Sequence, residues 1–440
     1  MKVIASCTGY QFAEIPYLKN AAGNEQGPAA VLTEEFDQEI LGFGAALTEG
    51  ACTVLHRLPE DKRNALLREL YSPEECGFSV GRICVGASDY AETPYHFAPA
   101  ADDFEMKHFD ASHDAAQILP VLRKAREINP ELFLFSSPWS PPGWMKSSGQ
   151  MQGGWMLEKY ITAYTLYYLR FLQYYREQGV RINALTPQNE SETDQVGRMP
   201  ACLWHPELEM KFSKEMRRLL DENDFEDVKI WLMDHNFIMW RRACFELSDE
   251  ETRAACAGIA WHPYEGSPEM MNWVRRQFPE SEHHWTEGEG INSLWSNPTY
   301  EKELSMGEIA NSFIQAIQNG CQSITVWNVA LDEAGCPNIG PFDCRGTVEI
   351  RREDGHIHYS NEFYTLSHFS KYVKRGARRI KVDSIAIPRR LSVAAFQNPD
   401  GSKVAIAANT SGFDDNLNLV CGEQSVLLRL PRESVSTVLF

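Results

Sequence analysis

Two glutamates follow predicted buried strands at points about a hundred residues apart in the chain. Residues 182–187 form an apolar run that a proline closes, and Asn189 and Glu190 come directly after it. Residues 283–287 form a second short run, which ends in Glu287. In parallel α/β sheets the carboxyl ends of the strands carry the reactive groups. Two carboxylates that meet there can cleave a glycosidic bond, one as proton donor and the other as nucleophile or base.

The separation of these carboxylates determines the stereochemistry of such a reaction. About 5–5.5 Å gives retention through a covalent intermediate, whereas about 6.5–9.5 Å leaves room for a water molecule and gives inversion. We expect the proton donor, Glu190, to have a raised pKa through burial or its partner's charge. We expect Glu287 to stay ionised beside a cation such as Arg82, and Asn189 to hydrogen-bond the sugar 2-hydroxyl. Glu289 follows the same strand as Glu287 and is the alternative to it.

The elements that must position these groups alternate between strand and helix. Strand patterns occupy residues 40–46, 79–85, 132–137, 182–187, 228–233, 257–262, 283–287 and 323–328. Helical patterns occupy residues 58–71, 113–128, 157–178, 206–221, 238–247, 268–277, 307–319 and 361–372. Eight such units predict a (β/α)₈ TIM barrel. The alternative is a doubly wound open sheet, but Gly42-Phe43-Gly44 lacks the third glycine of a dinucleotide-binding turn.

The sequence beyond residue 376 no longer alternates between strand and helix patterns. Four short strand-like runs at residues 390–396, 403–408, 425–430 and 434–440 are separated by turn signals. They predict an attached antiparallel β-sandwich module. The first 38 residues are rich in turn residues and have no helical period. We therefore expect three segments, namely residues 1–38, a catalytic barrel over 39–375, and a C-terminal module over 376–440, with the barrel and module docked rigidly.

Further polar and aromatic candidates lie at the ends of the predicted barrel strands. They are Arg82, Asp89, Trp139, Asn189, Asp234, His235, His262, Tyr264, Trp327 and Asn328. Each has a plain structural alternative. An Asn-Glu pair after a strand is a common helix cap, and His262 taken alone is a typical hydrogen-bonded core histidine. Trp139 stands beside prolines and either covers the barrel rim or offers a platform for a sugar ring.

Composition and charge exclude several classes of function. The net charge of −19, from 61 acidic and 42 basic residues, argues against binding to nucleic acid or to an anionic membrane. The sequence predicts no transmembrane helix and no secretory signal, so we expect a cytoplasmic protein. Eleven scattered cysteines indicate reduced, buried thiols. The His-containing pairs at residues 234–235 and 283–284 lack metal-ligand spacing, so we expect neither a metal nor another cofactor.

Several motifs, in order, resemble glycoside hydrolase family 30, the retaining β-glycosidases that include the glucosylceramidases. The segments that resemble it are residues 42–49 (GFGAALTE), 71–74 (YSPE) followed by Gly81-Arg82 and Ser88-Asp89, 136–146 (SSPWSPPGWMK), 327–338 (WNVALDEAGCPN) and 364–372 (YTLSHFSKY). The resemblance implies a (β/α)₈ barrel fused to a β-sandwich that takes strands from both chain ends. It also implies that Glu190 is the acid/base and Glu287 the nucleophile. The residues it places around the non-reducing sugar are Arg82, Asp89, Trp139, Asn189, Tyr264 and Trp327.

The chain departs from the family pattern at three positions. Ser191 follows the acid/base where the family has proline, Ala45 replaces a glycine, and Pro263 stands where glucosylceramidases carry an aromatic residue. The last change touches the pocket wall and therefore the leaving-group preference. We expect a retaining exo-β-glucosidase that acts on small glucosides. The alternatives are a β-xylosidase or β-fucosidase, an endo-β-1,6-glucanase or xylanase, and a catalytically inactive carbohydrate-binding barrel.

Overall fold

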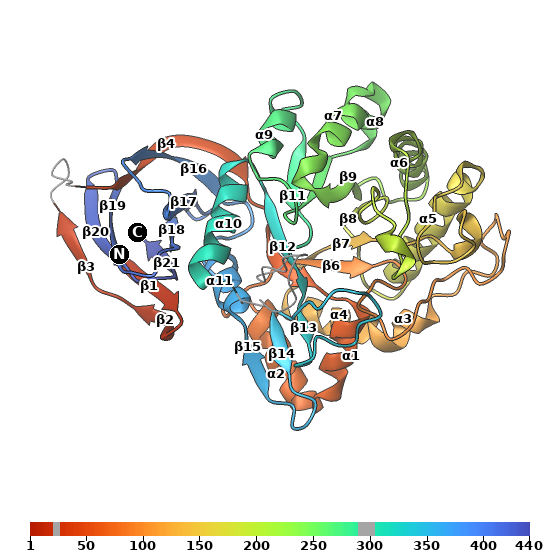
Figure 1. Cartoon of the computed structure of the whole chain (residues 1–440), viewed down its shortest axis with the longest axis horizontal. Helices are drawn as coiled ribbons and strands as arrows, with labels where there is room; N and C mark the ends of the chain where they lie inside the picture. Colours follow the sequence, from red (N-terminus) through yellow and green to blue (C-terminus); the bar gives the residue numbers. More distant parts are fainter. Residues whose placement is uncertain (21–26, 289–303) are drawn as a thin grey trace.

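The computed structural model describes residues 1–20, 27–288 and 304–440. It has two parts, a barrel surrounded by helices and a separate sheet at the left of Figure 1. Within the described residues, eight strands close the barrel, and each is parallel to its neighbours. The predicted TIM barrel is confirmed, and the alternative of an open doubly wound sheet is wrong.

The barrel strands run in chain order around the ring. They are β5 Gly42–Ala46, β6 Val80–Cys84, β7 Phe133–Ser137, β8 Ala184–Leu185, β9 Lys229–Asn236, β10 Gly258–His262, β11 Glu282–Trp285 and β12 Ser323–Asn328. All residues of β5, β6, β8, β10 and β12 are buried, as expected for strands covered on both faces. Five consecutive strands, β6 to β10, contribute Val80, Phe135, Ala184, Trp231 and Ala260 to one buried cluster.

The helices cover the outside of the barrel. They are α1 Glu49–Arg57, α2 Glu60–Tyr71, α3 Ser112–Gln117, α4 Leu119–Ile128, α5 Ile161–Glu177, α6 Pro206–Asp221, α7 Trp240–Ser248, α8 Glu250–Ala255, α9 Met270–Arg275, α10 Met306–Gln318 and α11 Asn361–Ser370. The sequence patterns missed α1 and α8. Thr48 begins α1 by accepting a hydrogen bond from the Ala51 amide at 3.1 Å. The predicted helix over 113–128 is two helices, because the chain breaks beside Pro120.

Three barrel strands differ from their predicted bounds in ways that affect the site. Only Ala184 and Leu185 of the predicted strand 182–187 pair as β8. Strand β11 ends at Trp285, so Glu287 follows the strand instead of closing it. Strand β9 runs on to Asn236, and the predicted strand end at residue 233 is wrong. Asp234 therefore lies within β9, and a side chain on a strand is held more firmly than one on a loop.

A small sheet follows the last barrel strand, and the sequence patterns did not predict it. It contains β13 Ala330–Leu331, β14 Val348–Ile350 and β15 Ile357–Tyr359. The loop from residue 332 to 346 connects β13 to β14. Asp332 fixes the start of this loop, since it accepts hydrogen bonds from Arg57 at 3.0 Å and Arg352 at 2.6 Å.

The second part of the molecule is a sheet of ten strands among the described residues, drawn from both ends of the chain. The N-terminal strands are β1 Lys2–Cys7, β2 Tyr10–Glu14, β3 Tyr17–Asn20 and β4 Ala29–Glu39, and the C-terminal ones are β16 Arg378–Ile385, β17 Leu391–Gln397, β18 Lys403–Asn409, β19 Asp415–Cys421, β20 Gln424–Leu430 and β21 Ser434–Leu439. Their order is β2-β1-β21-β18-β17-β16-β4-β19-β20-β3. Pairing is antiparallel except between β19 and β4. Strands β16 and β19 were missed, because their polar residues hide the alternation.

Buried polar contacts join the sheet to the barrel helices. His368 on α11 contacts Ser6 Oγ at 2.8 Å through Nε2 and Thr437 Oγ1 at 2.7 Å through Nδ1. Gln318, at the end of α10, donates to the Val393 carbonyl at 2.9 Å. Because His368 is fully buried, burial lowers its pKa to about 3, so the ring is neutral at the joint.

Two further features concern the chain as a whole. None of the helices within the described ranges combines the length and the apolar character that a bilayer crossing requires. All eleven cysteines fall within those ranges, and each is a free thiol, seven of them buried. The sequence predicted buried thiols, and four of the eleven are instead only partly buried.

Candidate active site

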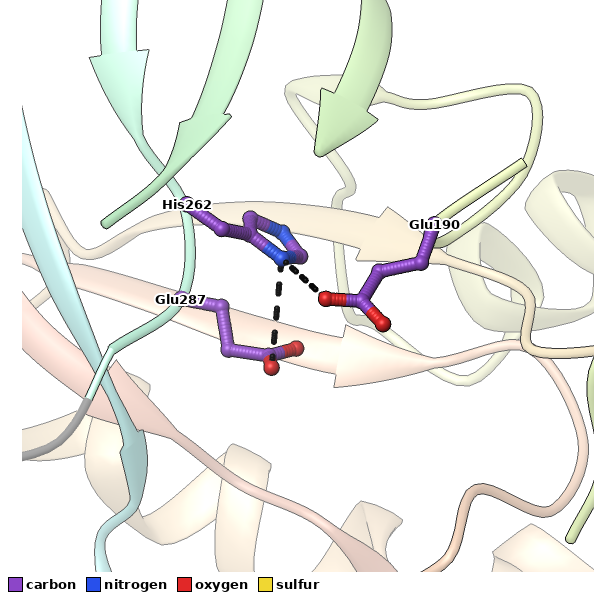
Figure 2. A group of neighbouring side chains, drawn as sticks. All are labelled: Glu190, His262 and Glu287. Carbon is purple, nitrogen blue, oxygen red and sulfur yellow. Dashed lines mark hydrogen bonds and ion pairs between the residues drawn. The ribbon is translucent and has the colours of Figure 1, made fainter. Parts of the chain in front are cut away.

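Glu190 and Glu287 meet at the carboxyl-terminal mouth of the barrel. Glu190 follows β8 and Glu287 follows β11, on different sides of the ring. An oxygen of each carboxylate and a ring nitrogen of His262 all lie within 4.8 Å of one another. Figure 2 shows the imidazole of His262 above the gap, facing both carboxylates. Two groups that are far apart in sequence can therefore reach the same bond of a ligand.

Arg82 is the cation at the centre of the site. Its side chain is fully buried on β6. It donates to Glu287 Oε2 at 2.5 Å, to Asn189 Oδ1 at 2.8 Å and to Asp234 Oδ2 at 2.7 Å. Burial alone would lower the pKa of Arg82, but the charges of Asp234 and Glu287 raise it. The expected contact between Arg82 and Glu287 is present, and Arg82 also fixes the orientation of the Asn189 amide.

Asp234 is a candidate from the sequence analysis that the family resemblance did not place around the sugar. Its Oδ2 accepts from Arg82 and from Thr186 Oγ1, both at 2.7 Å, and its Oδ1 accepts from Thr286 Oγ1 at 2.6 Å. Burial would raise the pKa of Asp234, yet Arg82 and His262 hold it well below its usual range. Asp234 is therefore an ionised group whose role is to hold its neighbours. Its position near the end of a predicted strand was the available signal.

His262 connects Asp234 to Glu190. Its Nδ1 lies 3.1 Å from Glu190 Oε1, its Nε2 lies 3.1 Å from Asp234 Oδ1, and Nδ1 is also 3.9 Å from Glu287 Oε1. Burial would lower the pKa of His262, but the surrounding carboxylates raise it to about 9. Both ring nitrogens face carboxylate oxygens, an arrangement that suits an imidazolium donating two charge-assisted hydrogen bonds.

The pKa directions of the two glutamates differ from those expected. Burial would raise the pKa of the Glu190 carboxyl, but the hydrogen bond from His262 and the nearby cations lower it. Burial raises the pKa of Glu287 more than His262 and Arg82 lower it, and the charges of Glu190 and Asp234 add to the rise. The expectation of a raised pKa at Glu190 is wrong for the ligand-free site, because His262 holds the proton beside it.

The backbone around these groups adopts a left-handed conformation that residues other than glycine rarely take. Glu190 has φ of 49°, Met233 of 73° and Asp234 of 47°. The Glu190 amide donates to the Asp234 carbonyl at 2.9 Å, which joins the two bends. Left-handed conformations of this kind cost about 1–3 kcal/mol each and gather at functional sites. The surrounding hydrogen bonds must therefore hold both bends in place.

Aromatic side chains form one wall of the site. The rings of Trp139 and Trp327 stack with centroids 4.9 Å apart and planes 20° apart. The Arg82 guanidinium lies 4.6 Å from the Trp139 ring centroid and 5.5 Å from that of Trp327. Tyr264 donates its hydroxyl to Glu287 Oε1 at 2.9 Å. Indole faces beside hydroxyl and amide groups are suited to bind a sugar ring, whose faces are apolar and whose edges are polar.

Two further predicted residues, Asp89 and Asn328, lie at the edge of this arrangement. Asp89 is 4% exposed, and its carbonyl accepts from the Ile339 amide at 2.7 Å. A Cβ at Gly340 would come within 2.6 Å of the Asp89 Cβ, so the loop after β13 passes directly against Asp89. Asn328 is fully buried, and its Oδ1 accepts from Thr48 Oγ1 at 2.7 Å. This bond ties Asn328 to the start of α1.

One contact to Glu190 comes from a residue without any sequence signal. Gln195 donates to Glu190 Oε2 at 3.1 Å from the loop that follows β8. Nothing in the spacing or the type of Gln195 marks it as a partner of a glutamate five residues earlier. Glu289, the alternative to Glu287, lies outside the described residues.

The side chains of Glu190, His262 and Glu287 also have the donor types and the spacing of a metal site. A cation there would compete with Arg82, which already neutralises Glu287 at 2.5 Å. It would also need His262 to lose its proton, although the pKa of His262 is raised to about 9. Their charges therefore suit a neutral ligand better than a metal ion.

Comparison with known proteins identifies both parts of the chain. Residues 40–373 match the glycosyl hydrolase family 30 TIM-barrel domain, and residues 376–438 match the family 30 beta sandwich domain. The lysosomal acid glucosylceramidase of Mus musculus is 26% identical over 417 residues, which covers 90% of this chain and 80% of that protein. The endo-1,6-beta-D-glucanase of Neurospora crassa is 27% identical over 396 residues, covering 85% of this chain and 79% of that protein.

Solved structures share the fold over almost the whole chain. SrfJ from Salmonella typhimurium superposes with a TM-score of 0.92 at 24% identity, covering 100% of this chain and 99% of that one. The catalytic domain of xylanase C from Talaromyces cellulolyticus gives 0.74 at 17% identity, covering 93% and 99%. The barrel and the sheet both match their domain families, and the chain therefore belongs to glycosyl hydrolase family 30.

Proposed function

We propose that this hydrolase is a retaining exo-β-glucosidase in which Glu287 is the nucleophile and Glu190 the acid/base. The observation that carries the proposal is the approach of the two carboxylates, whose nearest oxygens lie within 4.8 Å. Retaining enzymes hold their carboxyl groups about 5–5.5 Å apart, whereas inverting enzymes leave about 6.5–9.5 Å for a water molecule. This close approach supports the retaining arrangement over the inverting one.

The assignment of the two roles rests on the contacts of each carboxylate. Glu287 accepts hydrogen bonds from Arg82 and Tyr264. These two bonds orient its carboxylate oxygens and stabilise the anionic form that a nucleophile requires. Glu190 contacts His262 and Gln195, two groups that can exchange a proton with it or orient it. A group that must give and take a proton in successive steps needs such neighbours.

His262 supplies the proton that the first step consumes. With Nε2 donating to Asp234, a neutral ring can accept a hydrogen bond from a protonated Glu190 through Nδ1. Moving the proton from His262 Nδ1 to Glu190 Oε1 leaves the net charge of the site unchanged. The ligand-free site stores the proton on the imidazole, and a leaving-group oxygen beside Glu190 draws it onto the carboxyl as the glycosidic bond breaks.

The sugar at the reacting position is a β-glucosyl unit in this proposal. The relatives named as a glucosylceramidase and as a 1,6-β-D-glucanase share glucose as the sugar whose bond is cleaved. Because Oδ1 of Asn189 accepts from Arg82, its amide NH₂ group is directed elsewhere and is available to the 2-hydroxyl. Asp89 would accept from the hydroxyls at the far end of the ring, and the stacked pair of Trp139 and Trp327 would cover its apolar face.

Exo action is supported by the loop that closes over Asp89. Ile339 and Gly340 lie against Asp89, and backbone at this position supports a site that is closed at the non-reducing end of the sugar. The endo-β-1,6-glucanase alternative remains the second candidate, because a relative of that name is as similar to this chain as the glucosylceramidase. The free thiols favour a reducing compartment and thus small glucosides inside the cell.

A panel of substrates tests these assignments. The purified protein is assayed with aryl β-D-glucosides, β-D-xylosides and β-D-fucosides, and with β-1,6-linked gluco-oligosaccharides. We expect the glucosides to be cleaved fastest, and glucose to be the first product released from the oligosaccharides. Early release of disaccharides or longer fragments would replace the exo assignment with the endo one, and absence of turnover on the entire panel would favour the non-catalytic barrel.

A further inference from the structure

A buried arginine outside the proposed catalytic groups connects the loop after Glu190 to two helices. Arg242 lies on α7 and is 6% exposed. It donates to four acceptors, which are Glu246 Oε1 at 2.8 Å, Glu209 Oε2 at 2.7 Å, the Trp204 carbonyl at 3.0 Å and a carboxylate oxygen of Glu192. Buried charges are retained when every polar atom has a partner, and their removal is costly. None of these groups touches Glu287.

Glu209 extends this network to strand β9. It lies in the first turn of α6 and is fully buried. Its Oε1 accepts a hydrogen bond from the backbone amide of Met233 at 2.6 Å. Pairing of β9 with β10 is irregular at this point, because Leu232 and His235 lie opposite Ile259 and Trp261. Met233 and Asp234 thus share one partner position, which makes a β-bulge.

The bulge is where the site needs an unusual backbone. Met233 and Asp234 both have left-handed φ values, of 73° and 47°. A bulge frees an amide from the ladder, and a freed amide that is buried requires another acceptor. Glu209 is the acceptor for the amide of Met233, the residue directly before Asp234. This hydrogen bond therefore fixes that backbone amide.

The same carboxylate reaches the loop that carries Glu190. Ser191 Oγ donates to Glu209 Oε2 at 3.4 Å, and the Trp204 amide donates to the Ser191 carbonyl at 2.9 Å. Ser191 is one of the positions at which the sequence departs from the family pattern. Its hydroxyl gives Glu209 a contact on the residue directly after Glu190.

The charges of the cluster tie Glu209 to Arg242. Burial and the charge of Glu209 raise the pKa of Glu246 well above its usual range. Burial would lower the pKa of Arg242, but the charges of Glu209 and Glu246 raise it. The carboxylate of Glu209 and the Arg242 guanidinium form a directed pair at 2.7 Å.

We propose that Glu209, held by Arg242, is a positioning residue for the proposed acid/base, because one buried carboxylate binds both the bulge before Asp234 and the residue after Glu190. This inference rests on the proposed function. Glu209 touches no substrate. It acts by fixing the two strained segments, which the hydrogen bond from the Glu190 amide to the Asp234 carbonyl then joins.

The test is Glu209→Gln, which keeps the size of the side chain and removes its charge. A glutamine can accept from the Met233 amide through its oxygen, but its NH₂ group then faces Arg242 as a second donor. Misplacement of a reacting group by about 1 Å can cost about 10²-fold in rate. We expect kcat on phenyl β-D-glucoside to fall by about 10–10²-fold while KM changes less than about threefold, since the sugar contacts are untouched.

Leaving-group dependence separates positioning of Glu190 from general damage. Dinitrophenolate departs without acid help, whereas phenolate requires it. We expect Glu209→Gln to lower kcat/KM for phenyl β-D-glucoside much more than for 2,4-dinitrophenyl β-D-glucoside. Azide, which attacks the glycosyl enzyme without a general base, should restore part of the turnover of the dinitrophenyl substrate. An equal loss on both substrates, or no loss on either, would overturn the proposal.

Two further variants complete the design. Glu282→Gln removes a different partly buried carboxylate of the barrel, at the start of β11, where Glu282 pairs with Lys229 at 2.5 Å. We expect this control to show no dependence on the leaving group. Glu192→Gln removes a different carboxylate partner of Arg242, on a side chain that is 38% exposed. This variant therefore tests the positioning role if Glu209→Gln does not fold. It should show the same dependence, to a smaller degree.

The outcomes distinguish this inference from the proposed function. If Glu190→Gln shows the leaving-group dependence and the Glu209 and Glu192 variants do not, Glu190 is the acid/base and the positioning role is wrong. If Glu190→Gln itself behaves like the unmodified protein, the proposed function fails and the positioning role fails with it.

Discussion

The Nδ1 of His262 lies 3.1 Å from Oε1 of Glu190, and no other ring nitrogen of the described residues is as close to that carboxylate. This contact has a consequence for pH dependence. The folded-state pKa of His262 is raised to about 9, so the proton shared with Glu190 stays in the site below that pH and is lost above it. We expect kcat/KM to fall as the pH rises through about 9.

His262→Asn tests the origin of this alkaline limb. The variant removes the group that stores the proton, and the limb should then report Glu190 alone, at lower pH. We expect the limb to move toward acid by at least one pH unit and the maximal rate to fall. A limb that stays in place would show that another group controls it. The measurement is kcat/KM for an aryl β-D-glucoside from pH 4 to 10.

Glu190→Gln should show the loss expected for an acid/base residue. General acid–base help is worth about 10²–10⁴-fold, and we expect a loss in that range on phenyl β-D-glucoside. The loss should shrink on the dinitrophenyl substrate, and azide should restore turnover with formation of β-glucosyl azide. Product analysis by NMR checks this outcome. Formation of α-glucosyl azide would contradict double displacement with Glu190 as the base.

Arg82→Gln should destabilise the fold as well as abolish activity. Arg82 is fully buried, and its loss leaves Asp234 and Glu287 without their cation. Removing one partner of a buried ion pair costs about 3–5 kcal/mol. Arg218→Gln is the control, because its pair with Glu222 lies on the surface, where such pairs contribute less than about 1 kcal/mol. Urea unfolding measures both, and equal losses would contradict the central place of Arg82.

The joint between barrel and sheet should be sensitive to acid. Burial lowers the folded-state pKa of His368 to about 3, whereas the pKa of a histidine in an unfolded chain is about 6.5. The unfolded state therefore binds more protons between these pH values, and stability falls as the pH decreases from about 6.5 toward 3. The slope is about 1.4 kcal/mol per pH unit for one histidine.

His368→Gln checks this prediction through thermal unfolding at pH 7.5 and pH 5. The variant should be less stable at pH 7.5, because its amide cannot reproduce both contacts with Ser6 and Thr437, but it should lose less on acidification. The exposed His358 offers a control, since His358→Gln should leave the difference between the two pH values unchanged. A slope that is the same in all three proteins would contradict the assignment.

The sequence predicted the barrel and its catalytic face because both depend on local patterns. Arg82 lies within one apolar run of strand length, and Glu190, His262 and Glu287 end or follow three others, so parallel strands bring these side chains to one face. The same patterns could not predict α1, because Gly50, Ala51 and Cys52 in its first turn are too small to mark an apolar stripe. They also could not predict that β8 pairs through Ala184 and Leu185 alone, because strand length depends on neighbouring strands.

The features that sequence could not supply arise from contacts between distant segments. The bulge at Met233 and Asp234 exists because Glu209 offers an acceptor from another helix. The proton on His262 results from three carboxylates that surround one ring, a three-dimensional fact that no spacing records. The wrong expectation for the pKa of Glu190 has this cause, since it considered Glu190 with its partner carboxylate and without His262.

The most direct test of the account is to trap the covalent intermediate. The protein is incubated with 2,4-dinitrophenyl 2-deoxy-2-fluoro-β-D-glucoside, digested, and the labelled peptide is sequenced by mass spectrometry. We predict inactivation with one fluoroglucosyl group attached to Glu287. A label on Glu289 or Glu190 would contradict the assignment of the nucleophile, and turnover of the unfluorinated glucoside with inversion at the anomeric carbon would contradict the retaining mechanism itself.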